Sequence, residues 1–178
     1  TGPNWEHRSA LNGEMMPEDK QTVVATLVVV VHPDEEHILM GRKLRGFGMG
    51  KITGYGGKLE PGETPRQAIR REFHEESSFL LPEESFEHIG AIDFVFPYHP
   101  DWGFDCQVFR VDDFEELPPV SDELDPRWVA LEDLPATEMW ADNAHWLVLA
   151  ARGERFKARF TYGPDHEHLE SYHVSLQG

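Results

Sequence analysis

Cysteine and basic residues are both scarce in this sequence. The single cysteine, Cys106, excludes an internal disulfide framework and fits a protein of the reducing cytosol. The chain has 16 lysine and arginine residues against 33 aspartate and glutamate residues, which gives a formal net charge of −17. Binding along a nucleic-acid backbone requires a cationic surface, so we expect no nucleic-acid polymer as a partner.

Long apolar runs are also absent. The longest, Val23 to Val31, is about half the length that a membrane-spanning helix needs and is rich in β-branched residues, so it predicts a buried strand. The N-terminal segment lacks the basic and apolar regions of a signal peptide. We therefore predict a cytoplasmic protein without a membrane anchor. Residues 1–20 would form a partly disordered N-terminal extension, and residues 21–178 a single globular domain.

Short apolar segments rich in β-branched and aromatic residues predict most of the regular structure. We expect strands over the ranges 23–31, 38–43, 86–96, 104–111, 127–131, 156–162 and 168–176. Residues 44–57 are rich in glycine and predict a loop. Because strands alternate with two helical segments, the sequence predicts an α/β fold with a mixed β-sheet and helices against its faces.

The clearest helix lies within residues 63–77. Thr64 suits the N-cap, Pro65 the first helical position, and Gln67 completes a Thr-x-x-Gln capping box. A second helix is expected over residues 143–152.

Three glutamates share one face of the first helix. Glu72, Glu75 and Glu76 are spaced by three and four positions, so at about 100° per residue they point the same way. A solvated acidic face is the ordinary explanation, but these carboxylates repel one another and the basic residues of the helix largely point elsewhere. A hard divalent cation resolves the repulsion, and oxygen ligands favour Mg²⁺ or Mn²⁺ over zinc.

The other faces of this helix divide into an apolar stripe and a polar face. We expect Ile69, Phe73 and Leu80 to form the buried stripe next to the glutamates. The side chains expected to face solvent are Gln67, Arg70, His74 and Ser77.

The glutamates belong to a longer spaced motif that starts at Gly57. Glu63 follows after five intervening residues, and Arg71-Glu72-Phe73 and Glu75-Glu76 complete the pattern. The segment resembles the Nudix box of the Nudix hydrolases, except that Ser78 replaces the usual penultimate glycine. The resemblance implies an α/β/α sandwich with a mixed sheet. It also implies a divalent metal site and cleavage of a nucleoside diphosphate linked to another moiety.

Three further segments resemble the MutT-homologue branch of this family: "GFGMGKITGYGGKLEPGET", "SDELDPRWVALEDLP" and "MWADNAHW". The metal ligands that this branch implies are Glu72, Glu76, Glu123 and the backbone carbonyl of Gly56, with Glu75 close by. Glu72 is the first candidate for the base that accepts the proton of the attacking water, with Glu76 and Glu123 as alternatives. Arg71 would orient a carboxylate, although an ordinary surface ion pair is the simpler role.

The branch also implies a nucleobase pocket. The matching positions are Thr26, Lys43, Phe47, Thr53, Phe94, Trp140, Asp142, Asn143 and Tyr162. Aromatic rings here would stack on a purine, although such residues are more often core. Asp142 would accept from purine N–H groups or act as a helix N-cap. Thr53 and Asn143 stand where the branch has asparagine and aspartate.

The resemblance implies a Mg²⁺-dependent pyrophosphohydrolase, with Mn²⁺ as the other candidate metal. Its partner would be a small nucleotide, namely a purine nucleoside triphosphate, oxidised forms included, cleaved to the nucleoside monophosphate and pyrophosphate. One alternative is a Nudix hydrolase of a dinucleotide polyphosphate or a nucleotide sugar. A non-catalytic nucleotide sensor with a Nudix fold is the other, and the intact glutamates argue against it. The sequence leaves the physiological substrate and the oligomeric state open.

Overall fold

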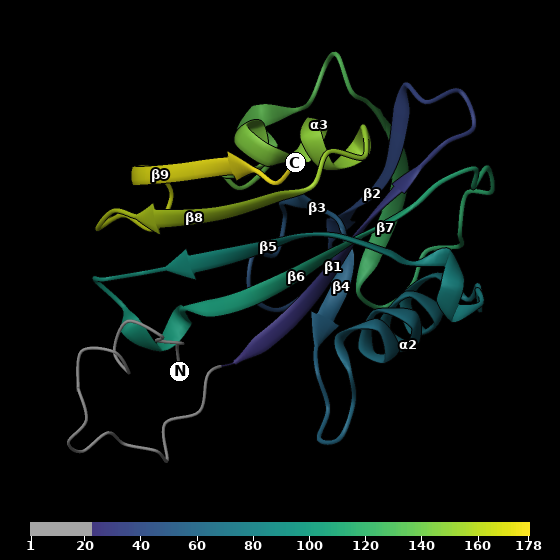
Figure 1. The fold of residues 1–178 in the computed structure, drawn as a ribbon, viewed down its shortest axis with the longest axis horizontal. Helices are drawn as coiled ribbons and strands as arrows, with labels where there is room; N and C mark the ends of the chain where they lie inside the picture. Colours follow the sequence, from purple (N-terminus) through teal and green to yellow (C-terminus); the bar gives the residue numbers. More distant parts are fainter. Residues whose placement is uncertain (1–22) are drawn as a thin grey trace.

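The computed structural model describes residues 23–178, whose path is shown in Figure 1. The strands are β1 (Val24–Val31), β2 (His37–Lys43), β3 (Ile52–Thr53), β4 (Tyr55–Lys58), β5 (Glu87–Val95), β6 (Phe104–Val111), β7 (Leu124–Ala130), β8 (Phe156–Tyr162) and β9 (Leu169–Leu176). The helices in this range are α2 (Pro65–Ser77) and α3 (Asn143–Ala151), with short 3₁₀ turns η1 (Glu83–Ser85), η2 (Pro100–Trp102) and η3 (Ala136–Glu138). None of these helices is long and apolar enough to cross a membrane. The extension predicted for residues 1–20 lies outside the described residues.

Most predicted elements are present within three residues of their expected ends, and the exceptions involve glycine. The segment predicted as a glycine-rich loop contains the short strands β3 and β4. Strand β4, "YGGK", has too little side chain to show a strand pattern, and it is held by backbone pairing to β1. The sequence missed both strands because their stability comes from partners distant in the chain.

Strand β1 lies at the centre of a mixed sheet. The strand order is β3-β2-β1-β6-β5-β8-β9, and β4 and β7 pair off this path with β1 and β2. The β1–β6 and β5–β8 pairs are parallel, and the other pairs are antiparallel. On one edge, β1 pairs first with β4 and then with β2. This change of partner lets β4 diverge from β2, as Figure 1 shows near the middle of the molecule.

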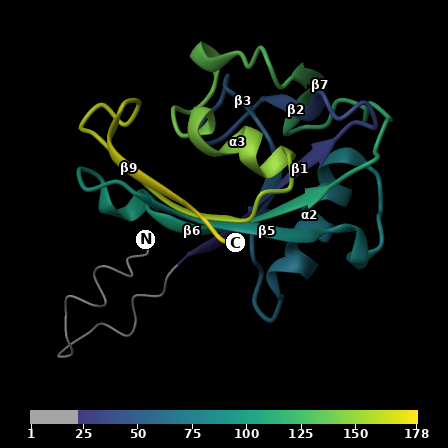
Figure 2. The ribbon, with the colours of Figure 1, turned by 45° about the horizontal axis from the view of Figure 1, so that its top comes forward.

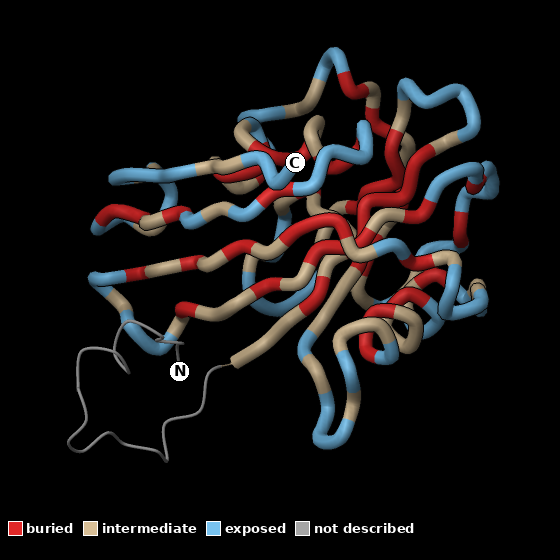
Figure 3. The backbone as a smooth tube through the Cα atoms, viewed as in Figure 1, coloured by how far each residue is buried: buried red, intermediate tan, exposed pale blue. Residues whose placement is uncertain are grey.

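Successive residues of β1 bury themselves in two different cores. Val28 and Val30 pack in the cluster that contains Ile69 and Phe73 of α2. Val29 and Val31 pack in the cluster that contains Trp146 and Leu147 of α3. Because side chains alternate across a strand, an uninterrupted valine run is buried on both faces. Figure 2 shows α2 and α3 on opposite sides of the sheet, and Figure 3 shows the buried segments concentrated in its central strands. The predicted α/β/α sandwich is confirmed.

The N-terminus of α2 forms as its sequence predicts. The Thr64 side chain accepts a hydrogen bond from the Gln67 backbone N–H at 3.1 Å. In return, the Gln67 side chain accepts one from the Thr64 N–H at 2.9 Å. These two bonds satisfy N–H groups that a helix N-terminus otherwise leaves unpaired.

The C-terminus of α2 departs from the prediction at two residues. Leu80 does not belong to the buried stripe, because the helix ends at Ser77 and Leu80 is 58% exposed. Ser77 does not face solvent. Its buried hydroxyl donates to the Phe73 carbonyl at 2.6 Å and accepts from the Phe79 N–H at 3.0 Å. A periodic pattern cannot locate the residue at which a helix stops, so both errors arise at the same boundary.

Ser78 explains how the helix ends without glycine. Its backbone is left-handed, with φ of 73° and ψ of 4°, and its N–H donates to the His74 carbonyl at 2.9 Å. The turn therefore has the geometry that a glycine normally provides, and serine adopts it with strain.

We predict that Ser78→Gly leaves the free energy of unfolding unchanged or raises it by up to about 1 kcal/mol, because relief of strain opposes the greater entropy of the unfolded chain. Urea denaturation monitored by circular dichroism measures the change. Ser171→Gly, at an exposed position of β9 without positive φ, is the matched control and should lower stability. A loss of more than about 1 kcal/mol for Ser78→Gly would contradict the glycine-like turn.

Candidate functional site

The glycines of β4 allow a glutamate of α2 to lie directly against the sheet backbone. A Cβ atom added to Gly57 would lie 2.3 Å from the carboxyl carbon of Glu72, and one added to Gly56 would lie 2.0 Å from the Thr26 carbonyl oxygen. Both distances are far below van der Waals contact. Any larger residue at these positions would displace either the Glu72 carboxylate or strand β1, so the two glycines are steric requirements of this arrangement.

Arg71 donates hydrogen bonds to three glutamates, Glu63, Glu72 and Glu75. Its Nε and Nη2 atoms donate to the two carboxylate oxygens of Glu63 at 2.7 and 2.9 Å. Its Nη1 atom donates to Glu72 at 3.0 Å and to Glu75 at 3.3 Å, and Nη2 also donates to the Lys58 carbonyl at 3.1 Å. The expectation that basic residues point away from the glutamates is therefore wrong for Arg71. The expected contact between Arg71 and a helix carboxylate is present.

The Arg71 hydrogen bonds lower the pKa of Glu63 to about 2. A lowered folded-state pKa means that the ionised carboxylate stabilises the fold at neutral pH. This contribution is present above the ordinary pKa of about 4.5 and is lost as the pH falls through that value towards about 2.

We predict that Glu63→Gln lowers the free energy of unfolding at neutral pH by about 1–2 kcal/mol, because the bidentate bond to a charged partner is lost. The difference from the wild type should shrink as the pH is lowered from about 5 towards about 2. Urea titrations at several pH values measure it. Glu60→Gln is the control, since that carboxylate lies 3.6 Å from Arg71 with 63% of its side chain exposed. A pH-independent difference would contradict this assignment.

Glu72 and Glu76 lie at the inner end of the acidic face, where burial opposes their ionisation. Burial, together with the nearby charges of Glu72 and Glu123, raises the pKa of Glu76 to about 8. Its Oε1 atom accepts a hydrogen bond from the Gly56 N–H at 3.2 Å, which acts in the opposite direction. Burial also raises the pKa of Glu72, partly offset by Arg71. Several like charges therefore meet at this point without a full set of cationic partners.

Glu123, directly before β7, lies close enough to the acidic face for its charge to act there. Its carboxylate forms an ion pair with Arg45 at 2.8 Å, and its charge acts on both Glu72 and Glu76. Within residues 23–178, no three acidic, histidine or cysteine side chains are already gathered at metal-binding distance. The donor set nevertheless fits a hard cation, because it consists of carboxylate oxygens and a glycine carbonyl whose mutual repulsion a divalent ion would relieve.

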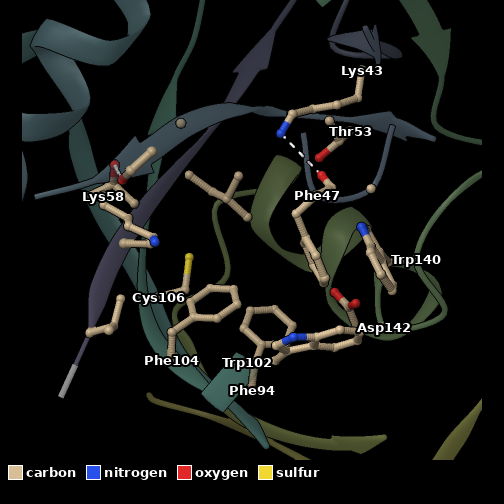
Figure 4. Close-up of a pocket in the computed structure, with 18 of the residues that line it drawn as sticks. Lys43, Phe47, Thr53, Lys58, Phe94, Trp102, Phe104, Cys106, Trp140 and Asp142 are labelled. Carbon is tan, nitrogen blue, oxygen red and sulfur yellow. Dashed lines mark hydrogen bonds between the residues drawn. The ribbon is translucent and has the colours of Figure 1, made fainter. Parts of the chain in front are cut away.

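A cavity of about 440 Å³ opens beside this acidic group. Gly56 and Glu76, two of the predicted metal ligands, form part of its wall. All the predicted nucleobase residues also line it: Thr26, Lys43, Phe47, Thr53, Phe94, Trp140, Asp142, Asn143 and Tyr162. Figure 4 shows the labelled members of this set around one hollow. The structure thus brings together residues from strands β1, β2, β3, β5 and β8, the 44–51 loop, the segment before α3 and the start of α3. Of the other predicted residues, Arg71, Glu72, Glu75 and Glu123 are outside this lining.

Aromatic rings form most of the cavity wall. Phe47 and Trp140 are stacked, with ring centroids 5.2 Å apart and planes inclined by 14° (Figure 4). Phe94 stacks on Phe104 at 4.8 Å. Phe47 is 52% exposed, whereas Phe94 is buried. Because the lining is flat and mostly apolar, the cavity suits a planar heterocycle.

A buried carboxylate provides the main polar group of the cavity. Asp142 accepts a hydrogen bond from the Tyr162 hydroxyl at 2.5 Å and one from Trp146 Nε1 at 2.7 Å. Burial raises its pKa, and these two donors lower it. Asp142 precedes α3 as the N-cap residue, but its side chain does not cap the helix. Its carboxylate is therefore oriented by two fixed donors beside the cavity.

Thr53 and Asn143 carry polar groups that line the cavity and hydrogen-bond to no other described side chain or backbone group. Asn143 is 8% exposed, so its amide has little access to bulk water. Lys43 differs, because its Nζ atom donates to the Phe47 carbonyl at 3.2 Å (Figure 4). The hydroxyl of Thr53 and the amide of Asn143 thus remain available to a ligand.

Sequence reasoning missed part of the lining. The additional aromatic and sulfur-containing residues are Phe96, Trp102, Phe104 and Cys106. Cys106 is 1% exposed, and burial raises the pKa of its thiol. Trp102 lies in the loop "PYHPDWG" between β5 and β6. A tryptophan in a loop flanked by proline and glycine is the signal that could have identified it, because such a large ring is rarely left in open solvent.

Comparison with known protein families and proteins gives consistent matches. A family model described as the NUDIX domain matches residues 21–150. The oxidized purine nucleoside triphosphate hydrolase of Danio rerio is 42% identical over 137 residues, covering 77% of this chain and 85% of that protein. The protein of the same name from Mus musculus is 34% identical over 147 residues, covering 83% and 90%.

Two further matches are more distant. The NAD-capped RNA hydrolase NudC of Pseudomonas syringae pv. tomato is 30% identical over 129 residues, but these cover 72% of this chain and only 44% of that protein. Among solved structures, the mutator MutT protein from Bacillus halodurans superposes with a TM-score of 0.69 at 22% identity, covering 85% of this chain and 97% of that one. At this identity the structural likeness supports the fold alone.

Proposed function

Because the chain belongs to the Nudix family, we propose that it is a Mg²⁺-dependent pyrophosphohydrolase of oxidised purine nucleoside triphosphates, releasing the nucleoside monophosphate and pyrophosphate. The observation that carries this proposal is the position of the aromatic cavity. Its wall includes Gly56 and Glu76, so a base held among the rings would have its phosphates beside the acidic group.

The most similar relatives named above support the substrate class. Both are named for hydrolysis of oxidised purine nucleoside triphosphates, and the chain covers 85% and 90% of their lengths. The chain covers only 44% of the NudC relative, so the match gives weaker support for the activity named for that protein.

The acidic side chains would hold the metal. We assign Glu72, Glu76, Glu123 and the Gly56 carbonyl as ligands, with Glu75 close by. When bound, a divalent cation supplies neutralisation of phosphate charge and a lower pKa for the attacking water. The all-oxygen donor set favours Mg²⁺, with Mn²⁺ as a substitute.

Glu72 is assigned as the group that accepts the proton of the attacking water. Arg71 donates to its Oε2 atom at 3.0 Å, which fixes the carboxylate and leaves Oε1 free to take the proton. Glu76 and Glu123 are the alternatives for this role. Arg71 acts as a positioning residue, since its own contacts are to carboxylates and to a backbone carbonyl.

The aromatic wall and a few polar groups would bind the base. Trp140 and Phe47 offer ring faces for stacking, and Asp142 offers carboxylate oxygens to purine N–H donors. Thr26 holds the Gly57 carbonyl at 2.9 Å and so joins the cavity to β4. Thr53 and Asn143 would contribute the groups that distinguish one base from another. The remaining assigned wall residues are Lys43, Phe94 and Tyr162.

The proposed type of partner and the proposed cellular location rest on the composition of the chain. The excess of acidic residues supports a small nucleotide rather than a nucleic-acid polymer as partner, since phosphate binding needs positive charge supplied locally or by metal. The single buried cysteine supports a cytoplasmic location.

We predict that Glu72→Gln lowers kcat by at least about a hundredfold, because the amide keeps the shape but loses charge and basicity. Glu76→Gln should raise the Mg²⁺ concentration needed for half-maximal rate. Steady-state kinetics on 8-oxo-dGTP across a Mg²⁺ titration measures both effects. Circular dichroism establishes that the variants are folded, and Glu83→Gln, at an exposed position of η1, is the control. Wild-type rates for both folded variants would refute the metal-site assignment.

A separate prediction concerns base selectivity. An amide at Asn143 offers one acceptor and a donor pair, and Thr53 has a shorter reach than asparagine. We therefore expect a weaker preference for 8-oxo-dGTP over dGTP than in the resembled branch, which has asparagine and aspartate at these positions. The double variant Thr53→Asn plus Asn143→Asp should raise that preference, measured as the ratio of kcat/KM values. A wild-type ratio already in the thousands, or a double variant without any gain, would show that these two positions do not set selectivity.

A Mg²⁺-dependent hydrolysis screen with identified products tests the proposed function as a whole. The panel should contain 8-oxo-dGTP, the four ordinary deoxynucleoside triphosphates, a dinucleotide polyphosphate and a nucleotide sugar. Preferred cleavage of the last two would replace the proposed substrate within the same family. Tight nucleotide binding without cleavage of any member would favour the sensor alternative.

A further inference from the structure

Two loops that carried no predicted site residue meet at the rim of the cavity. One connects β5 to β6 and contains Trp102 in η2, and the other is the β8–β9 turn, residues 163–168. Trp102 lines the cavity, as Figure 4 shows. His166 of the turn packs against Trp102, with ring centroids 4.6 Å apart. These loops therefore join the C-terminal hairpin to the cavity wall.

Histidine rings support Trp102 from outside the cavity wall. His99 stacks on the indole at 4.0 Å with an interplanar angle of 24°. The two histidines also contact each other, with ring centroids 5.8 Å apart. Backbone hydrogen bonds from Trp102 N–H to the His99 carbonyl and from His99 N–H to the Phe96 carbonyl, both 3.0 Å, fix this turn. The indole is thus held on a short, hydrogen-bonded support.

The orientation of Trp102 differs from that of the stacking rings. Phe47 and Trp140 are nearly parallel, whereas Trp102 is inclined by 73° to Phe47 at a centroid distance of 5.2 Å. A base stacked on Phe47 or Trp140 would lie parallel to that ring and at a steep angle to the indole. Trp102 therefore closes one end of the cavity and limits how far a base extends in its own plane.

The β8–β9 turn is linked to two aromatic residues of the cavity, to Trp140 through Lys51 and to Trp102 directly. Glu167 forms an ion pair with Lys51 at 2.9 Å, and the Lys51 ammonium lies 4.6 Å from the centre of the Trp140 ring. His166 reaches Trp102 with a left-handed backbone, φ of 60°, and its Nε2 atom is buried without a hydrogen-bond partner among the described residues. Positive φ and an unpaired buried nitrogen both cost stability, so surrounding packing must hold this ring against the indole.

We propose that Trp102 is a specificity-determining residue of the base cavity and that His99 and His166 are positioning residues for it. The proposal rests on the proposed function, since it concerns the purine that the site accepts. Trp102 would contact the base edge and reject bases enlarged in the ring plane. It would leave the phosphate chemistry at the acidic group unaffected.

The first experiment compares dATP with 1,N6-etheno-dATP, in which a fused ring enlarges the base within its plane. Trp102→Leu should raise KM for dATP about tenfold and change kcat by less than about twofold, because one aromatic contact with the base is lost. The ratio of kcat/KM for the etheno nucleotide to that for dATP should rise about tenfold. An unchanged ratio overturns the proposal, and so does a fall in kcat with KM unchanged.

The second experiment separates positioning from general stability. His99→Ala should raise KM for dATP in the same direction as Trp102→Leu, and His99→Phe, which keeps a stacking ring, should restore it. His166→Asn, which suits the left-handed backbone, should also raise KM. Tyr172→Leu is the matched control, because it removes a ring stacked on His145 at 3.9 Å outside the cavity lining. Equal effects of Tyr172→Leu and His99→Ala overturn the positioning role.

Equilibrium binding distinguishes failure of this inference from failure of the proposed function. Titration of the wild type and Trp102→Leu with dAMP and etheno-dAMP, without metal, reports on the cavity independently of hydrolysis. A wild type that binds these monophosphates but cleaves no purine triphosphate would refute the proposed function. The role of Trp102 in base selection would still be supported if Trp102→Leu shifts the ratio of the two Kd values about tenfold. No binding of either monophosphate by a wild type that cleaves purine triphosphates would overturn this inference and leave the proposed function standing.

Discussion

The close approach of α2 to the bare backbone of β4 is the contact on which the rest of the site depends. Without side chains at Gly56 and Gly57, the Glu72 carboxylate lies against the sheet and Glu76 accepts a hydrogen bond from the strand. The same strand pairs with β1, whose Thr26 lines the neighbouring cavity. The absence of side chains at Gly56 and Gly57 therefore fixes the distance between the acidic side chains of α2 and the aromatic cavity.

Electrostatic repulsion is confined by this arrangement. The protein concentrates acidic groups on one helix although its formal net charge is already −17. Arg71 compensates the outer carboxylates through fixed, bidentate geometry, whereas the inner pair stays under-compensated and partly buried. The folded protein therefore keeps mutually repelling carboxylates close together. A cation bound there would stabilise the folded protein as well as serve the reaction.

The sequence predicted two kinds of feature: those that depend on neighbouring residues, and those that match the motifs of the Nudix family. The Thr64–Gln67 capping box is local, so its pattern could be read directly. The acidic face followed from spacing along the helix, whereas the residues of the cavity wall followed from the family resemblance. Failures occurred where distant partners decide the outcome. Leu80 follows a helix end set by a left-handed residue, and β4 exists because β1 pairs with it. Trp102 was missed because one of its two supporting rings, His166, lies in another loop.

The two halves of the site differ in how far apart their residues lie along the chain. Strands β1 and β4 and helix α2, which carry most of the acidic half, are contained within residues 24–77. The aromatic half needs Trp140, Asp142 and Tyr162, and its walls are tied together by the β8–β9 turn. During synthesis, a nascent chain that ends before residue 140 already contains every acidic residue assigned to metal but has no complete surface for a base. Base recognition is therefore acquired last, with the C-terminal hairpin.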